Sequence, residues 1–196
     1  SDTLMPLAAL MGARAVLLAH GSGGRCFDEA LSGVWWQLRD KLAQSHGDAF
    51  VQAHPFPQAC ASVTVELRGQ TDVRHDLATS DAQAIMAYLV HLGVLAGAAP
   101  TLPPLACAPT PLAGTEVLTA PHAGVLTFLR EPGDDIAAGD VVAEVIDPVP
   151  GQTTPIRATV NGVLYARHIV RWATTGLDIG KVSGQTPMRS GNLLSA

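Results

Sequence analysis

The 196-residue sequence predicts an α/β region followed by a small all-β domain. Up to residue 97, amphipathic patterns of helical period alternate with short apolar runs, as in α/β proteins. Residues 98–114 contain five prolines, which is typical of a linker. From residue 115 on, only short strand patterns separated by Gly and Asp turns occur. The predicted division is therefore an α/β region at 1–97, a linker at 98–114, a β-domain at 115–184 and a tail at 185–196.

The first region is expected to begin with a helix-like segment at 4–11 and to contain two strands and two longer helices. Residues 14–19 are almost continuously apolar, which predicts a strand covered on both faces. Residues 62–68 alternate, with Val63, Val65 and Leu67 on one face and Thr64, Glu66 and Arg68 on the other. Residues 28–44 place apolar side chains at helical spacing and follow Asp28, a candidate N-cap. A second helix is expected from Ser80, where a capping-box pattern begins, to the terminating Gly93.

These strands are too few for a complete sheet. A sheet covered by helices on both faces commonly has five or more strands, but the first 97 residues supply two or three. We therefore expect this region to be the C-terminal part of a larger α/β domain whose first part lies outside this chain.

The second region contains an internal repeat. Residues 120–126 match 158–164 at an offset of 38, and residues 132–145 are echoed by 171–182. Two such units interlocking predict a β-sandwich that resembles the lipoyl/biotinyl type, the barrel-sandwich hybrid. Carriers of that type present a lysine at the hairpin between their halves, whereas residues 147–152 contain none. The domain is therefore predicted to be a structural or oligomerisation appendage.

Composition restricts the partners. The net charge of −5, with two lysines and no basic run, excludes nucleic-acid binding. Charged residues make up 15%, below the usual ~25%, which favours a homo-oligomer. The linker prolines exclude a membrane span there, and the sequence opens without a signal-peptide pattern. Three separated cysteines indicate neither a disulfide framework nor a thiolate metal site, so we expect a cytoplasmic protein.

Three stretches together resemble one family. They are Ser22-Gly23-Gly24 with Phe27-Asp28-Glu29-Ala30, then Thr64-Val65-Glu66-Leu67-Arg68-Gly69-Gln70-Thr71-Asp72-Val73, then a lipoyl-like module opening with Ala120-Pro121-His122-Ala123-Gly124. Over residues 4–184 the chain is similar to the succinylglutamate desuccinylase/aspartoacylase family. The resemblance implies a carboxypeptidase-like mixed sheet in the first region, a zinc cofactor and a small N-acyl amino acid as substrate.

The resemblance also implies roles for two residues. Glu66 corresponds to the family's catalytic glutamate, which takes a proton from zinc-bound water and passes one to the leaving amine. Arg68, two residues on, is expected to bind the substrate or to orient Glu66. The family's zinc ligands lie in His-x-x-Glu and Asp-Leu-His motifs, and neither motif occurs here. No metal ligand is therefore expected in this chain, which is expected to be inactive alone because no water would be activated without zinc.

Other candidates keep more than one interpretation. His20, before a Gly-rich turn, is either a metal ligand, part of an oxyanion loop or structural, and His75 with Asp76 either line the cleft or belong to a surface loop. His122 and His168 either bind a metal or are half-exposed strand residues. Asp28 and Glu29 are interpreted as helix-start carboxylates, and Trp35 with Trp36 as core and interface residues rather than a stacking platform. The alternative function is a non-catalytic binding or oligomerisation module.

Overall fold

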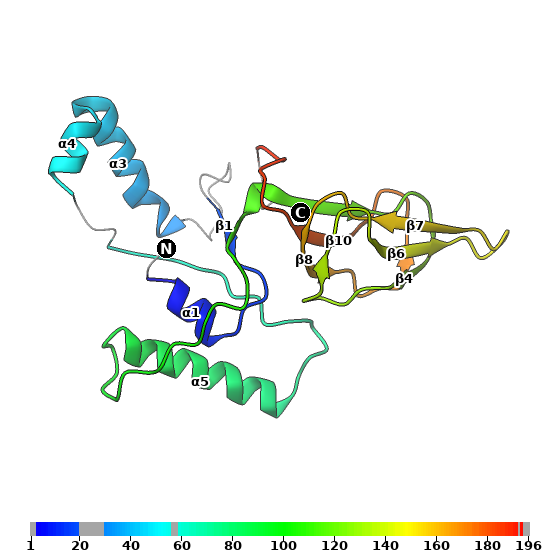
Figure 1. The fold of residues 1–196 in the computed structure, drawn as a ribbon, viewed down its shortest axis with the longest axis horizontal. Coiled ribbons are helices and arrows are strands. Elements are labelled where there is room, and N and C mark those ends of the chain that lie inside the picture. Colours follow the sequence, from blue (N-terminus) through cyan, green and yellow to red (C-terminus); the bar gives the residue numbers. More distant parts are fainter. Residues whose placement is uncertain (1–2, 20–29, 56–58, 192, 194–196) are drawn as a thin grey trace. The chain divides into compact units, whose positions relative to one another are not determined.

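The computed structural model describes residues 3–19, 30–55, 59–191 and 193, and these form two compact units. Among them, the first unit comprises residues 3–12 and 30–105, and the second comprises residues 13–19 and those from 106 on. Figure 1 shows helices in the first and strands in the second. The fold thus combines helices with antiparallel sheets, which agrees with the predicted α/β class in its broad outline.

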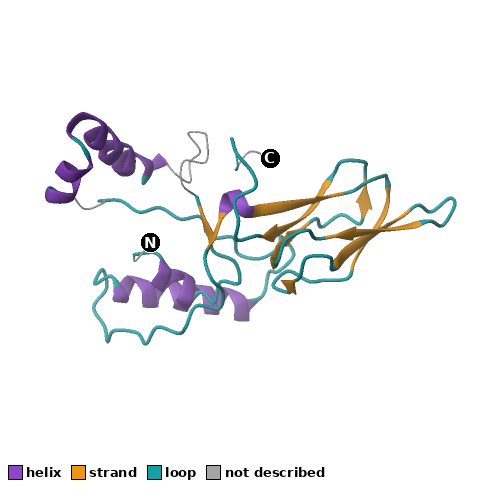
Figure 2. Cartoon of the chain, turned by 45° about the horizontal axis from the view of Figure 1, so that its top comes forward, coloured by secondary structure: helices purple, strands orange, loops and turns teal. Residues whose placement is uncertain are grey.

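The first unit is helical. Its helices are α1 (Met5–Leu10), α3 (Gly33–His46), α4 (Asp48–Ala53) and α5 (His75–His91), drawn purple in Figure 2. The segment 4–11 and the helix at 28–44 are thus found at nearly the predicted places, although Asp28 itself lies outside the described residues. Gly93 ends α5 as predicted, with a φ of 72° that glycine adopts without steric cost.

The start of α5 corrects a prediction. The helix begins at His75, five residues before Ser80, and its N-cap is the extended Arg74. Arg74 pairs with Asp76 in the first turn, with a distance of 2.6 Å between Nη2 and Oδ2. The capping-box pattern at Ser80 therefore falls inside the helix, because a pattern of four residues cannot reveal helical turns that precede it.

The predicted strand at 62–68 is also wrong in this structure. These residues form no strand, and Arg68 has a φ of 68°, which breaks the alternation of faces. The apolar face predicted for the helix at 28–44 is largely exposed as well, since Leu31, Val34 and Leu38 are 63%, 60% and 42% exposed. Ala9 and Ala84 are the buried hydrophobic residues among those described in this unit, so it holds no extended core.

The other expected strand is short and belongs to the second unit. It is β1 (Leu17–Leu18), which pairs in parallel with β2 (Thr110–Pro111) inside the predicted linker. Arg14 adds a hydrogen bond of 2.7 Å from Nη2 to the carbonyl oxygen of Gly133. Residues 14–18 of the predicted first region and residues 110–111 of the predicted linker therefore belong to the second unit. The described part of the first unit contains no sheet.

The second unit consists of two four-stranded sheets that the repeat builds together. The strands are β3 (Thr115–Thr119), β4 (Gly124–Phe128), β5 (Asp135–Ile136), β6 (Val141–Ile146), β7 (Thr153–Arg157), β8 (Gly162–Arg167), β9 (Trp172–Ala173) and β10 (Asp178–Ser183). The sheet orders are β3-β10-β8-β5 and β7-β6-β4-β9, and all these pairs are antiparallel. Each sheet therefore takes two strands from each repeat, which is the predicted interlocking.

The core of this unit follows the same repeat. Leu126 and Leu164 are 38 residues apart and both are buried, as are Val145 and Val182 at an offset of 37. Gly162, the first residue of β8, lies so close to the carbonyl oxygen of Ser183 that no side chain would fit there. The start of β8 therefore packs directly against the end of β10. The predicted repeat is therefore present in the strands, in the core and in the close approaches of the backbone.

Candidate active site

Glu66 lies on an exposed segment that has no helix or strand. Its carboxylate makes no hydrogen bond or ion pair with any residue that the structure describes. The sequence placed this side chain on a rigid strand, where few rotamers would be lost on fixing it. Residues 59–74 form no helix or strand, so the catalytic role of Glu66 stays a prediction.

Arg68 is held by α5. Its guanidinium donates two hydrogen bonds to Asp81, from Nη1 to Oδ2 at 2.8 Å and from Nη2 to Oδ1 at 2.9 Å. The hydrogen bond to Asp81 raises the pKa of Arg68, and the same bond lowers the pKa of Asp81. This bidentate geometry fixes the end of the 62–68 segment on the second turn of the helix. Arg68 therefore has an intramolecular carboxylate partner, and its role in binding a substrate stays a prediction.

A turn follows directly and helps to hold this arrangement. Asp72 accepts a hydrogen bond from the backbone N–H of Gly69 at 2.9 Å, and its own N–H donates to the Gly69 carbonyl at 3.1 Å. These bonds reverse the chain between Arg68 and the start of α5. The carboxyl end of the candidate segment is thus ordered by local contacts.

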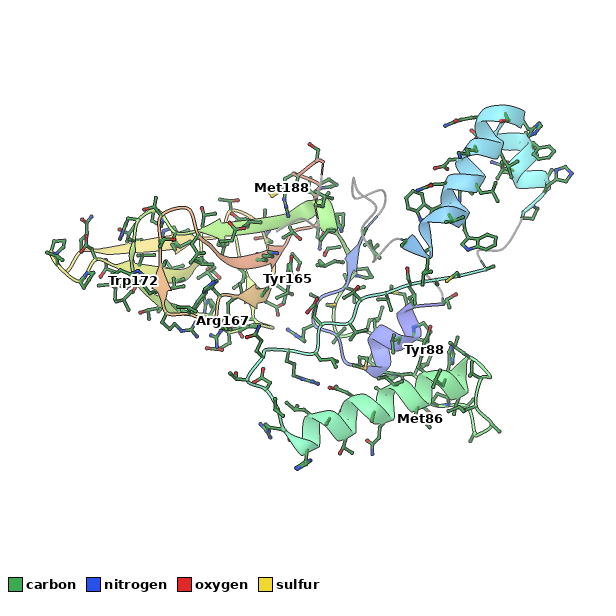
Figure 3. The ribbon with its side chains drawn as sticks, turned by 180° about the vertical axis from the view of Figure 1, so that it is seen from behind. Met86, Tyr88, Tyr165, Arg167, Trp172 and Met188 are labelled. Atoms are coloured by element: carbon green, nitrogen blue, oxygen red, sulfur yellow. The ribbon has the colours of Figure 1, made fainter. Side chains whose placement is uncertain are left out.

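An open depression of about 490 Å³ runs along α5. It is lined by His75, Ala78, Thr79, Ala82, Gln83 and Met86, all from one stripe of this helix. Figure 3 shows Met86 and Tyr88 on different sides of α5, and the Tyr88 hydroxyl donates to the carbonyl of Thr3 at 2.7 Å. His75 was predicted either to line a cleft or to belong to a surface loop. It is instead the first residue of α5, and it lines this shallow depression. Glu66 is not among the lining residues.

The remaining candidates have structural surroundings. His122 lies 2.9 Å from the Thr154 hydroxyl through Nε2, and His168 interacts through Nδ1 with the backbone of Val170. Trp35 and Trp36 are half-buried. His20, Asp28 and Glu29 lie outside the described residues.

The described residues do not fit a zinc ion. Nowhere in residues 3–19, 30–55, 59–191 and 193 do three His, Cys, Asp or Glu side chains gather closely enough to hold a metal. A zinc site needs three or four such ligands. Zinc dependence is therefore kept below as part of a proposal, and no step is derived through the metal.

Two features were missed at the sequence level. Asp81 was read as part of a helix start, although it binds Arg68. In the second unit, Arg167 and Arg171 lie over the Phe128 ring at 5.5 and 5.1 Å from its centroid, and Arg167 pairs with Glu131 at 2.7 Å. Strand assignments that end at Phe128 and Arg167, the last residues of β4 and β8, could have indicated this stacking. The Arg68–Asp81 pair had no such signal.

Solved structures show what the chain is similar to. A succinylglutamate desuccinylase/aspartoacylase family protein from Shewanella amazonensis aligns with a TM-score of 0.68 and 27% identity, covering 90% of this chain and 47% of that one. The resemblance to this family is confirmed. A protein of the same group from Shewanella frigidimarina aligns with a TM-score of 0.74 and 24% identity, over 93% of this chain and 48% of that one. The ectoine utilization protein EutE (DoeB) from Ruegeria pomeroyi shares the fold, with a TM-score of 0.57 and 18% identity, over 95% and 52%.

The likeness to the desuccinylase/aspartoacylase family is structural and partial. The chain spans about half the length of these solved structures. A scan against protein-family models gives no match, and a search of curated proteins gives no significant match. None of the described helices is both long and apolar enough to cross a membrane.

Proposed function

We propose that this chain is part of a zinc-dependent hydrolase that cleaves the amide bond of a small N-acyl amino acid. The observation that carries the proposal is the similarity to the Shewanella amazonensis family protein over 90% of the chain. The family is known by the reactions in its name, removal of a succinyl group from succinylglutamate and of an acyl group from aspartate. The proposed substrates are therefore N-acylated acidic amino acids.

Within this proposal Glu66 is the residue that moves the proton. A carboxylate suits this task because it accepts a proton from an attacking water and returns one to the leaving amine near neutral pH. Its lack of any partner in the described residues leaves both oxygens available for such a role. Arg68 is proposed to orient Glu66 or to attract the anionic substrate, which requires that its bonds to Asp81 loosen or are shared.

The zinc ligands are proposed to lie outside residues 1–196, so this chain by itself is proposed to be inactive. Residues 1–97 are then the C-terminal part of the catalytic domain. Residues 115–184 are proposed to be a barrel-sandwich hybrid without a carrier lysine, which mediates homo-oligomerisation in the cytoplasm. The repeat supports the barrel-sandwich hybrid. The low charge content supports homo-oligomerisation, and the separated cysteines support the cytoplasm.

Hydrolysis of N-succinylglutamate and N-acetylaspartate tests the proposal. The protein at its natural length is expected to release the free amino acid from at least one of them, and treatment with 1,10-phenanthroline is expected to stop the release. The recombinant 1–196 chain is expected to release none. Absence of hydrolysis by the natural-length, zinc-loaded protein across a panel of N-acyl amino acids would favour the binding-module alternative.

A further inference from the structure

The two sheets of the second unit end in equivalent short strands. β5 is the last strand of one sheet and β9 is the last strand of the other. Asp135 of β5 pairs with Val163 on β8, and Trp172 of β9 pairs with Val125 on β4. Asp135 and Trp172 therefore occupy equivalent places in the repeat, and the two sheet edges can be compared position by position.

The β5 edge is protected. Proteins commonly block an open edge strand with charge, with proline or with a covering segment, because such a strand can pair with another chain. Pro132 and Asp135 lie at this edge. Arg14 covers it, since its Nη2 donates a hydrogen bond of 2.7 Å to the Gly133 carbonyl oxygen and lies 3.9 Å from Oδ1 of Asp135. All three protective devices are thus present at the β5 edge.

The β9 edge has none of them. Residues 166–173 contain no proline and no acidic residue. Ile169, Val170 and Trp172 are instead 57%, 53% and 49% exposed, and Val125 beside Trp172 is 39% exposed. Among the residues that the structure describes, β4 is the only strand next to β9. The repeat therefore protects one edge and leaves the equivalent edge apolar and open.

The backbone of β9 shows what a further strand would meet. The carbonyl of Arg171 accepts a hydrogen bond of 2.9 Å from the N–H of Leu126 on β4. Strands bond to one neighbour at every second residue, so Arg171 and Ala173 direct their backbone groups toward β4. The N–H and the carbonyl of Trp172 then point away from β4, where a strand on the open side can bond to them.

The charge at this edge indicates the chemistry of the partner. Residues 166–173 contain two arginines in a chain whose net charge is −5. Arg167 pairs with Glu131 at 2.7 Å. Arg171 donates from Nη1 to the carbonyl oxygen of His168 at 2.7 Å, and in the described residues it has no carboxylate partner. Arg171 is therefore available to a carboxylate from outside the chain.

The side chains of β9 also specify a pattern. Trp172 and Arg171 point to opposite faces of the sheet, because neighbouring side chains of a strand alternate. On one face Trp172 lies beside Val125, and on the other Arg171 lies over the Phe128 ring at 5.1 Å from its centroid. An added strand thus meets an apolar surface on one face and a cation on the other. A segment with apolar and acidic residues at alternate positions fits both.

We propose that the β9 edge binds an extended segment of another protein, with apolar and acidic residues at alternate positions, as an additional strand of the sheet. A second copy fits less well. Two β9 strands would bring Arg171 of both copies to one edge, where like charges oppose pairing, and the acidic β5 edge of a second copy is covered by Arg14. The inference goes beyond the proposed hydrolysis and does not depend on it.

Peptide titration followed by amide NMR of the 1–196 chain tests the proposal. The probe is an acetylated and amidated peptide of three Val-Glu repeats, and its counterpart has three Val-Lys repeats. The Val-Glu peptide is expected to shift the amide signals of residues 169–173, to protect the Trp172 amide from exchange and to bind at least ~10-fold more tightly than the Val-Lys peptide. Equal affinities, or shifts confined to other residues, would overturn the proposal.

A charge reversal at the edge sharpens the test. Arg171→Glu is expected to reverse the preference, so that the Val-Lys peptide binds more tightly than the Val-Glu peptide. Arg157→Glu is the matched control, because Arg157 is an exposed arginine of β7 at the opposite edge of the same sheet, and it is expected to leave both affinities unchanged. Slow exchange of the β6 amides shows that each variant is folded. An unchanged preference in a folded Arg171→Glu chain would contradict the proposed contact.

Three other results would identify a different occupant and overturn the proposal. Signals of residues 169–173 that shift with the concentration of the chain alone would show that a second copy covers the edge. Peptide binding by the 1–196 chain but not by the protein at its natural length would show that a further segment of the same protein covers it. Binding to phosphatidylglycerol vesicles that is lost in Arg171→Glu, without binding of either peptide, would assign the edge to a lipid surface.

Discussion

Replacing Leu164 by alanine is expected to unfold the second unit at much lower temperature. The side chain is fully buried at the centre of β8, between strands of both repeats. The substitution removes three carbon atoms, and at about 0.8 kcal/mol for each buried methylene the transfer cost is about 2.4 kcal/mol. The cavity left behind raises the expected loss to about 3–4 kcal/mol. For a unit of this size the melting temperature is then expected to fall by about 15 °C.

The repeat makes this prediction sharper. Leu126 occupies the equivalent place in β4 and is 1% exposed, so Leu126→Ala is expected to cost about as much as Leu164→Ala. Val149→Ala, on the exposed hairpin, is expected to change stability by less than about 0.5 kcal/mol. Urea unfolding followed through exchange of the β6 and β10 amides measures this unit by itself. A loss below about 1 kcal/mol at Leu164, or losses at the two leucines that differ greatly, would refute a single core shared by two interlocked repeats.

Two further predictions concern a close approach and an ion pair. Gly162→Ala is expected to destabilise the unit by more than about 3 kcal/mol, because the added Cβ would collide with the Ser183 carbonyl. Gly176→Ala is expected to cost about 1 kcal/mol, because the added Cβ has open space and only the positive φ of 79° is unfavourable. Equal losses of stability in thermal unfolding would contradict the close approach at Gly162. Bonding to Arg68 lowers the pKa of Asp81, so this pair stabilises the first unit fully above the carboxyl's ordinary pKa of 3.8, and that stabilisation is lost as the pH falls through the lowered folded-state value. Relative to the intrinsic exchange rate at each pH, the protection of the α5 amides is expected to fall below pH 4 in the unsubstituted chain and to change little with pH in Asp81→Asn; the same loss of protection in both would show that another group titrates.

The second unit could be predicted from the sequence because its information is local and duplicated. Gly124 and Gly162 each open a strand where the backbone of another strand passes close, and Gly139 and Gly176 each make a turn with positive φ. A residue type required by sterics at two equivalent places produces a detectable repeat. The interlocking of the two units followed from that repeat, whereas the strand count did not, because the repeat predicts three strands in each unit and the structure has four.

The first unit was predicted less well because its structure depends on partners. Helices formed near the expected places since their hydrogen bonds are internal to each segment. The alternating 62–68 segment did not become a strand, since a strand needs a neighbour to bond with and none lies in the described residues. The Arg68–Asp81 pair, 13 residues apart, could not be foreseen either, because no periodicity links a loop residue to the second turn of a later helix.

Glutamine at position 66 provides the most direct test of the proposed chemistry. In the natural-length protein, Glu66→Gln is expected to lower kcat/KM for the hydrolysed N-acyl amino acid by about 10²- to 10⁴-fold. Its zinc content and its hydrogen exchange are expected to stay unchanged. Glu144→Gln, on a strand of the second unit, is the matched control and is expected to retain full activity. Hydrolysis by Glu66→Gln at the rate of the unsubstituted protein would contradict the account.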